Sequence, residues 1–393
     1  MNRNFFWLVV TRFLFVLGVQ IQAVLMGWQM YDLTHSPMQL GLIGLAEAAP
    51  ALSIAMIAGW LVDQFNPFRF YQVTLMVSFT SMWISSVAKE PHYLFYAALL
   101  TGLARSFTGP AMNSIVPRIV SREDLKRTSA FTTMAFKIGT VVGPGLAGLL
   151  LAVQGYVLPY RVAQFCLILA SLSLLFIHYD HKKVVRAKNP SLLPELLMGA
   201  KFVFQHPLLL SVMSLDMFAV LFGGVVAMLP IYAVEVLHMG PQGLGYLRSA
   251  PAAGAIIMSL ILIRKPIVRH AGRALLWSVL GFGICVLVFG ISKSFWISFA
   301  ALAVSGALDS ISMVIRGTIV QMCSPDSMRG RIAAVNSIFI GSSNELGQFE
   351  SGLAASVLGT VPSVMFGGAM TIVTVIVVFL RSKRLRRLNL NEI

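Results

Sequence analysis

The chain has 393 residues, of which 57% are apolar and only 11% are charged, and its mean hydropathy is +0.80. A soluble domain carries about 25% charged residues, so a water-soluble globule of this composition is excluded and lipid is the expected solvent. The net charge of +15 raises the question of nucleic acid. However, Lys and Arg lie in short connectors between apolar segments, as topology signals of membrane proteins do. We therefore expect no nucleic-acid partner.

Twelve apolar segments, each about the length that crosses a bilayer, follow one another along the chain. The first begins just after Arg3 and has no small-residue cleavage site before about Tyr31, so a retained helix is predicted rather than a signal peptide. Six segments precede the longest connector, at 5–31, 38–62, 70–88, 92–116, 129–154 and 159–178. Six follow it, at 208–234, 241–263, 273–291, 294–320, 331–358 and 361–380.

The distribution of basic residues predicts the orientation. With the N-terminus in the cytoplasm, roughly 22 of the 30 Lys and Arg are cytoplasmic and about 3 lie outside. Both termini are then cytoplasmic, and we expect a multi-pass protein of the bacterial inner membrane. The predicted parts are a six-helix bundle over 1–178, a cytoplasmic linker over 179–207, a second bundle over 208–381 and a basic tail over 382–393. Residues 192–204 of the linker are amphipathic, which favours a helix on the membrane surface.

The two halves of the chain are related by an internal repeat with an offset of about 204 residues. The matched positions are Pro37 with Pro241, Gly41 with Gly245, Gly102 with Gly306, Arg127 with Arg331, Gly143 with Gly347, Gly148 with Gly352 and Gly155 with Gly359. Chance explains one or two such matches in glycine-rich helices, but not this many at one offset. Because the first segment falls on the seventh, both copies have the same orientation. The predicted fold is an all-α membrane protein of twelve transmembrane helices in two six-helix parallel repeats.

Two motifs in the first half of the chain carry a family resemblance. Gly59–Asp63, with Arg69 just beyond, resembles the signature that major facilitator transporters have between their second and third helices, although Gln64 stands where that family usually has Arg. Arg105 followed by Gly109 is similar to the fourth-helix motif of the same superfamily. The resemblance implies a gating role for the first motif.

The fifth segment holds a third motif, because Gly139, Gly143, Pro144 and Gly148 resemble the antiporter motif of the superfamily. Small residues there allow close backbone approach, and the proline allows a bend. Finer likenesses to the branch of enterobactin exporters and macrolide efflux proteins lie at 11–13, at 33–37 and at 328–331, which includes Arg329 and Arg331 as further gating candidates. The resemblance covers nearly the whole chain. It implies export driven by the proton motive force and does not name the cargo.

Ionisable side chains at bilayer depth cost about 2.5–3.5 kcal/mol each, so each needs a partner, a cavity or a function. The proton-coupling candidates are Glu47, Arg105, Asp216, Asp309 and Glu345. Desolvation favours a neutral Glu47 and a nearby cation favours a charged one, so alternating access offers a way to load and unload a proton. A static ion pair with Arg105 that only joins two helices explains Glu47 equally well. Both interpretations stay open.

Arg12 and Asp216 occupy the same position in the two repeats, so they are candidates for an inter-domain ion pair that closes the inner gate. The alternative is that Arg12 snorkels and Asp216 pairs within its own half. Arg316 is interpreted as a topology residue near the cytoplasm. The polar run of the eleventh segment either lines a cavity or packs tightly against a neighbouring helix, and we favour the cavity. Two glutamines seven residues apart in the first segment suit a polar wall opposite. The substrate-cavity candidates are Arg12, Gln22, Gln29, Asn344, Glu345, Gln348 and Glu350.

Motifs for other functions are missing from the sequence. It has no Gly-x-x-x-x-Gly-Lys-Ser/Thr phosphate loop, no His-Glu-x-x-His and no Gly-x-Ser-x-Gly. We therefore expect no enzyme, no cofactor and no metal site. Three functions remain: a proton-coupled exporter of a small amphiphilic molecule such as a siderophore or drug, an importer or lysolipid translocator on the same fold, and a non-transporting sensor or assembly protein. The expected partners are a small-molecule substrate, protons and the lipid bilayer, and we expect a monomer.

Overall fold

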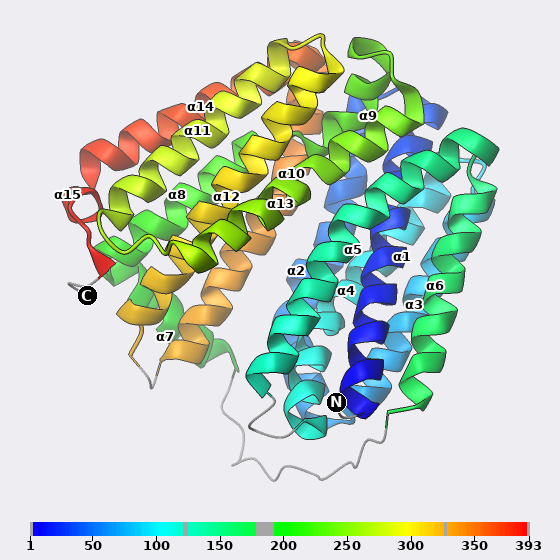
Figure 1. Cartoon of the computed structure of the whole chain (residues 1–393), viewed down its shortest axis with the longest axis horizontal. Coiled ribbons are helices and arrows are strands. Elements are labelled where there is room, and N and C mark those ends of the chain that lie inside the picture. The colour runs from blue at the N-terminus through cyan, green and yellow to red at the C-terminus, as the bar shows by residue number, and fades with distance from the viewer. Residues whose placement is uncertain (1–2, 121–124, 178–191, 326–327, 391–393) are drawn as a thin grey trace. The chain divides into compact units, whose positions relative to one another are not determined.

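In a computed structural model, the chain is described over residues 3–120, 125–177, 192–325 and 328–390, and this part of it is built from helices (Figure 1). Residues 179–191 of the predicted linker lie outside the described residues. The first half contains six long helices, α1 (Arg3–Thr34), α2 (Pro37–Gln64), α3 (Pro67–Val87), α4 (Pro91–Ile119), α5 (Leu125–Gln154) and α6 (Val157–Leu175).

The second half begins with the shorter α7 (Leu192–Gln205) and α8 (Pro207–Gly223). An irregular stretch follows: the 3₁₀ turn η1 (Val225–Met228), the single turn α9 (Leu229–Ile231) and the π-helical η2 (Tyr232–Val236). The remaining helices are α10 (Gly240–Arg264), α11 (Ala271–Ile291), α12 (Phe295–Cys323), α13 (Arg329–Leu358), α14 (Thr360–Arg381) and α15 (Lys383–Arg386).

All twelve predicted ranges fall on helical segments, and the seventh is interrupted after Gly223 by the irregular stretch. By length and composition, eight helical segments of the described chain are able to cross a membrane, and α2, α3, α4 and α13 are not among these eight. The protein is thus multi-pass. That twelve helices cross the bilayer, and that both termini are cytoplasmic, stay predictions.

Local sequence explains where several helices begin and end. α2, α3, α4 and α8 each start with a proline, whose missing N–H is not needed in the first helical turn. α5 is followed by Gly155 at φ +62° and α13 by Gly359 at φ +90°. Backbone with positive φ favours glycine, because other residues are strained there. These two glycines are a matched pair of the repeat, so the same turn chemistry follows the fifth segment of each half.

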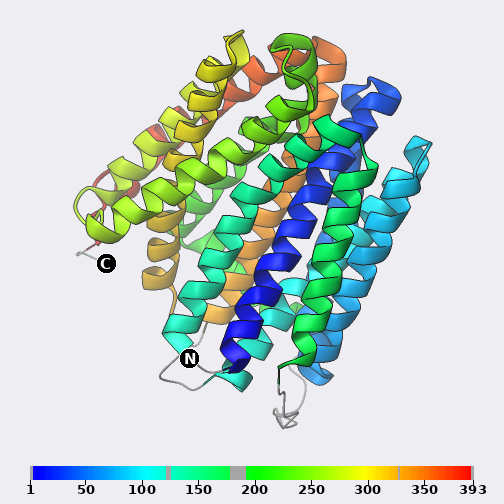
Figure 2. The ribbon, with the colours of Figure 1, turned by 45° about the vertical axis from the view of Figure 1, so that its right-hand side comes forward.

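The chain forms two compact units. Unit 1 comprises 1–186 together with 230–249, and unit 2 comprises 187–229 together with 250–393. In unit 1, α1 packs against α5 and α6, while α4 packs against α2 and α3; these helices run side by side in Figure 2. Residues 230–249, which the predicted boundaries assign to the second bundle, cluster with the first six helices.

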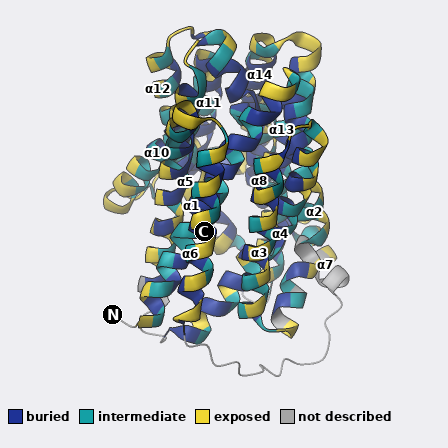
Figure 3. Cartoon of the chain, turned by 90° about the vertical axis from the view of Figure 1, so that its right-hand side faces the viewer, coloured by how far each residue is buried: buried dark blue, intermediate teal, exposed yellow. Residues whose placement is uncertain are grey.

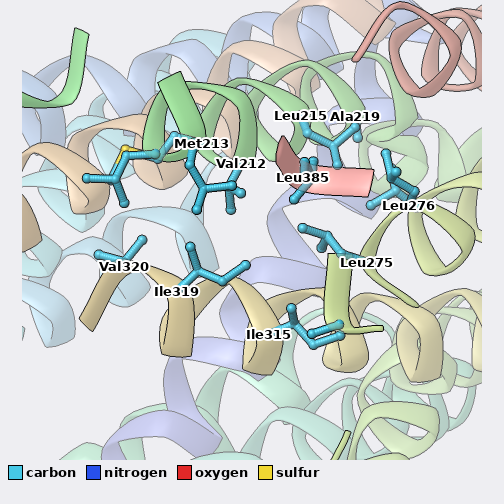
Figure 4. Close-up of a cluster of buried hydrophobic side chains, with 14 of the residues drawn as sticks. Val212, Met213, Leu215, Ala219, Leu275, Leu276, Ile315, Ile319, Val320 and Leu385 are labelled. Carbon is cyan, nitrogen blue, oxygen red and sulfur yellow. The ribbon is translucent and has the colours of Figure 1, made fainter. Parts of the chain in front are cut away.

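In unit 2, α11 packs against α12 and α14, and α8 packs against α13 and α14. Its core joins apolar side chains of α8, α11, α12 and α15 (Figure 4). The amphipathic segment of the linker is helical as α7, and it packs on α13, where Gly199 lies against the backbone of Arg331. One side of α7 is therefore covered by protein.

Burial in each unit follows the pattern of a protein solvated by lipid. Exposed positions recur along the helices of each unit (Figure 3). Large apolar side chains are among them, such as Trp277 at 69% and Trp296 at 75%. Hydroxyl side chains such as Ser81, Ser298 and Thr371 are buried between helices instead. Apolar surface of this extent marks contact with a membrane or a partner, and acyl chains are the expected neighbours here.

The repeat is also visible in how glycines let helices approach. A Cβ added at Gly102 would overlap the backbone carbonyl of Glu47, and a Cβ added at Gly306 would overlap that of Pro251. Gly306 and Pro251 lie 204 residues after Gly102 and Glu47, so the two contacts are equivalent under the repeat. In the same way Gly143 packs on the carbonyl of Leu17 and Gly347 on that of Leu221. Equivalent helix crossings in the two halves support the parallel repeat.

Candidate functional site

The predicted residues Glu47 and Arg105 come together in unit 1. Arg105 Nη1 on α4 lies 2.5 Å from Glu47 Oε1 on α2. The side chains are 18% exposed for Glu47 and 45% for Arg105. The pair is therefore formed between two helices of one unit, yet both members keep a share of accessible surface.

The backbone beside this pair is closely packed. Pro50 has no N–H, so the carbonyl of Ala46, next to Glu47, lacks its helical donor. The Ser106 hydroxyl lies 3.2 Å from the Pro50 carbonyl oxygen and 3.0 Å from that of Gly102. Together with the close approach at Gly102, these contacts fix the register of α2 against α4. The Glu47 carboxylate is thus placed by backbone packing as well as by Arg105.

A second cation faces the same carboxylate. Arg248, in the part of α10 that belongs to unit 1, is half-buried and donates from Nη1 to the carbonyl oxygen of Ala23 at 2.8 Å. It also lies near enough to Glu47 to interact electrostatically. No pattern in the sequence links Arg248 to Glu47, because the rotation of a helix leaves no signal in a uniformly apolar segment.

A cavity of about 390 Å³ lies elsewhere in unit 1, between α1, α4 and α5. Arg12, a predicted cavity residue, lines it together with Asn113, Thr132 and Thr133. The Arg12 guanidinium carbon lies 5.3 Å from the ring centroid of Phe136, a cation–π contact. Arg12 Nη1 is buried and makes no hydrogen bond to the described residues. The cavity therefore offers a cation, hydroxyls and an amide to an anionic or polyhydroxylic group.

Unit 2 holds a different ion pair. Asp216 on α8 pairs with Arg316 on α12, and the two side chains are 9% and 5% exposed. Asp216 therefore has a partner within its own half, the alternative to a gate with Arg12. Arg316, interpreted from sequence as a topology residue near the cytoplasm, is instead a buried partner of a carboxylate. The prediction failed because distance along a helix says nothing about which face the side chain occupies.

The polar run of α13 is divided between packing and exposure. Glu345 is buried and accepts a hydrogen bond from Gln348 Nε2 at 3.4 Å, whereas Asn344 is exposed and donates to its own helix. Ser351 donates to the Gly224 carbonyl oxygen at 2.9 Å, so this face of α13 packs where α8 ends. The other two predicted carboxylates, Asp309 on α12 and Glu350 on α13, are half-buried.

The two glutamines predicted to line a cavity are buried between helices instead. Gln22 Nε2 donates to Ser81 Oγ at 2.7 Å. Gln29 donates to the Ala88 carbonyl oxygen at 3.0 Å and accepts from Tyr160 Oη at 3.0 Å. Gln22 and Gln29 do lie on one face of α1, but this face packs against α3 and α6. Their hydrogen bonds join α1 to the neighbouring helices. The prediction that they line a cavity is therefore corrected: they are packing residues.

Unit 1 thus holds a partly accessible ion pair and a separate cavity lined by a cation. Within the described residues, no group of three or more His, Cys, Asp or Glu side chains is placed to hold a metal ion. The three cysteines are free. A carboxylate shared between two cations, with a separate cationic cavity, resembles a site that moves a charged solute more than one that makes or breaks covalent bonds.

Sequence comparison identifies the family to which this arrangement belongs. Residues 1–392 match the family described as a transmembrane secretion effector. The chain belongs to this family of the major facilitator superfamily. Among its relatives are the enterobactin exporters EntS of Escherichia coli O1:K1 / APEC and of Citrobacter koseri. Each is 25% identical over 328 residues, which cover 82% of this chain and 78% of the relative.

Solved structures show the same fold. A bacterial homolog to the human lysosomal transporter Spinster, in an inward-facing and occupied conformation, has a TM-score of 0.79 at 12% identity and covers 97% of each chain. A POT family transporter in complex with 5-aminolevulinic acid has a TM-score of 0.78 at 10% identity, over 98% of this chain and 97% of that one. The relatives are transporters and not enzymes, and this major facilitator protein is a transporter.

The antiporter-like motif of α5 makes close helix contacts on two sides. Gly139 and Gly143 lie against α1, and Gly148 lies against the backbone of Gly245 at the start of α10. The Pro144 carbonyl oxygen faces the same glycine of α10. A side chain at any of these glycines would force the helices apart, which explains the small residues.

The remaining major facilitator motifs lie at helix ends. Arg69 is exposed near the start of α3, and the side chain of Asp63 lies outside the described residues. On α13, Arg329 is exposed and Arg331 Nη1 lies 4.0 Å from the Met198 sulfur of α7. α7 and the start of α13 thus form one packed region. The gating role of these residues stays a prediction.

Proposed function

We propose that this major facilitator protein is a proton-coupled exporter that moves a small amphiphilic molecule, such as a siderophore or a drug, out of the cytoplasm by alternating access. The observation that carries the proposal is the ion pair of Glu47 with Arg105, formed at a partly exposed position inside helical segments. A fixed structural pair is better served by full burial, whereas a proton carrier must be reached by protons and must exchange partners.

The coupling follows from the two charge states of Glu47. When Glu47 is ionised, it holds Arg105 and attracts Arg248. When it takes up a proton, the attraction to both cations is lost. Arg105 then loses this carboxylate as a partner, and an anionic group of the cargo takes its place. The ionised carboxylate of Glu47 and the cargo thus compete for the same cation, which couples the binding of cargo to the protonation of Glu47.

The nature of the cargo is inferred from the Arg12 cavity and from the relatives. Arg12 offers a buried guanidinium nitrogen and an aromatic neighbour, which suit an acidic or catechol-bearing aromatic molecule. The EntS relatives are named as enterobactin exporters, which agrees with this chemistry. In the same proposal the two bundles, 1–178 and 208–381, are the moving halves of a monomer in the bacterial inner membrane, with both termini cytoplasmic.

The test is flux in proteoliposomes under an imposed pH gradient, with siderophores and lipophilic drugs as cargo. Glu47→Gln keeps the size of the side chain and removes the charge. Glu90→Gln is the matched control, because Glu90 is an exposed carboxylate between α3 and α4 whose side chain is 68% exposed. We expect gradient-driven flux in the wild type and in Glu90→Gln, and its loss in Glu47→Gln.

Two results decide against the proposal. If wild-type flux of every cargo is independent of the gradient, the protein is not proton-coupled. If Glu47→Gln transports as fast as the wild type under the same gradient, the proton travels through another group. Arg12→Gln provides a separate reading of the cargo, since it should weaken flux of an anionic siderophore more than flux of a cationic drug.

A further inference from the structure

A second cavity lies in unit 2 and has no role in the transport site proposed above. Its volume is about 580 Å³, and it is formed by α11, α14, α15 and the residue after α15. Four of its lining residues are basic: Arg273, Lys383, Arg386 and Arg387. None of the described residues that line it is acidic. Four cations without a carboxylate among them create a site for a strongly anionic group.

The basic residues are held in place by a folded tail. Leu385 is fully buried and lies among core side chains of α8 and α11 (Figure 4). The Leu388 carbonyl oxygen accepts from Gly272 N at 3.3 Å, and Leu390 N donates to the Val268 carbonyl oxygen at 3.1 Å. Asn389 Oδ1 accepts from His270 N at 2.8 Å. The tail is thus tied to the turn that precedes α11, and its cations are positioned rather than loose.

The other wall of the cavity is apolar and faces outward. Trp277 is 69% exposed, and Ile376 and Phe379 are exposed beside it. These residues lie on α11 and α14, both of which are long and apolar enough to cross a membrane. Arg386 lies 4.8 Å from the ring centroid of Phe379, where the cations meet the apolar wall. One end of the cavity therefore suits a headgroup and the other suits hydrocarbon.

We propose that this cavity binds one anionic phospholipid, with its phosphate held by Arg273, Arg386 and Arg387 and an acyl chain lying along Trp277 between α11 and α14. A basic pocket between membrane helices is the arrangement expected for an anionic lipid headgroup. A soluble anion would not cover the exposed apolar wall, and a zwitterionic lipid would gain little electrostatic attraction from four cations. The apolar wall therefore favours a lipid over a soluble anion, and the four cations favour an anionic lipid over a zwitterionic one.

Quenching of tryptophan fluorescence by lipids with brominated acyl chains tests the proposal in the purified, intact protein. The signal of the site is the difference between the wild type and Trp277→Phe, since the chain has six tryptophans. Brominated phosphatidylglycerol should quench Trp277 at lower lipid fraction than brominated phosphatidylcholine. Arg386→Gln with Arg387→Gln should remove most of this preference, by about fivefold for each charge. Arg384→Gln is the matched control, since Arg384 belongs to α15 but does not line the cavity.

Three outcomes would overturn the proposal. The first is equal quenching of Trp277 by the two lipids, and the second is a loss of preference in Arg384→Gln as large as that in the double variant. The third is release of phosphatidylglycerol by inorganic phosphate, which would indicate a site for free anions. Helical circular dichroism and a single elution peak establish that each variant is folded. If the double variant does not fold, Arg273→Gln replaces it, because Arg273 is exposed on α11 and lies outside the packed tail. Preference unchanged in Arg273→Gln then counts against the site.

Discussion

Two ion pairs join helices inside the two units, one between α2 and α4 and one between α8 and α12. Glu47 and Arg105 are 18% and 45% exposed, whereas Asp216 and Arg316 are 9% and 5% exposed. The chemistry of the partners is the same, and only the surroundings differ. A buried pair is expensive to break, because the remaining charge has no solvent. A partly exposed pair contributes little to stability and is free to exchange.

The comparison therefore separates two roles that the sequence does not distinguish. The Asp216–Arg316 pair joins α8 to α12 inside unit 2, and the Glu47–Arg105 pair of unit 1 is the one that we propose for coupling. The following variants break or sharpen this contrast, in order of decreasing effect on the free energy of unfolding.

Arg316→Met should have the largest effect. It leaves Asp216 buried without its cation, which costs about 3–5 kcal/mol, and thermal unfolding in detergent measures the loss. Adding Asp216→Asn should recover part of the lost stability, since the orphaned charge is removed. If Arg316→Met alone is as stable as the wild type, the pair is dispensable for stability, and the two pairs do not differ in the way described above.

Gly102→Ala and Gly306→Ala compare equivalent helix crossings in the two units. Each new Cβ meets a backbone carbonyl, and overpacking of this kind costs about 1–3 kcal/mol. Only Gly102→Ala displaces Glu47, so only this variant should also slow proton-driven flux. Gly109→Ala is the control, because a Cβ there meets nothing within 4 Å. Equal loss of flux in both crossing variants would argue against a special role for the α2–α4 contact.

Tyr31→Phe tests a third carboxylate, Glu235, which accepts a hydrogen bond from Tyr31 Oη at 2.5 Å within unit 1. Losing this bond should cost about 1 kcal/mol. We expect amide hydrogen exchange of 232–236 to accelerate about fivefold, with the exchange of α4 unchanged. Exchange that accelerates equally everywhere would indicate global destabilisation rather than release of this segment.

Glu47→Gln should have the smallest effect on stability, about 0.2–1 kcal/mol, as for other partly exposed pairs. Thermal unfolding beside Arg316→Met measures the difference directly. The same variant is expected to abolish gradient-driven flux. Strong destabilisation by Glu47→Gln would make Glu47 a structural residue and leave the contrast between the two pairs without support.

Sequence predicted the helical ranges and the repeat well, because both depend on composition and spacing. The offset of the repeat pairs Gly102, Gly143 and Gly155 with their partners from sequence alone, and close contacts or positive φ explain each pair. Helix faces were predicted poorly. Gln22 and Arg316 lie in segments that are apolar all round, where periodicity does not separate the lipid side from the protein side. Ion pairs between helices depend on that rotation.

The chain passes from unit 2 to unit 1 at 229–230 and returns at 249–250. Both crossings coincide with weakened helical hydrogen bonding. The first crossing follows the 3₁₀ turn that begins after Gly224, and Pro230 is the residue just after the crossing. The second crossing lies just before Pro251, which has no N–H to donate to the carbonyl of Leu247. Bending the backbone at either crossing sacrifices fewer hydrogen bonds than bending a regular helix would. These two connections are thus the most easily bent parts of α10 and of the stretch after α8.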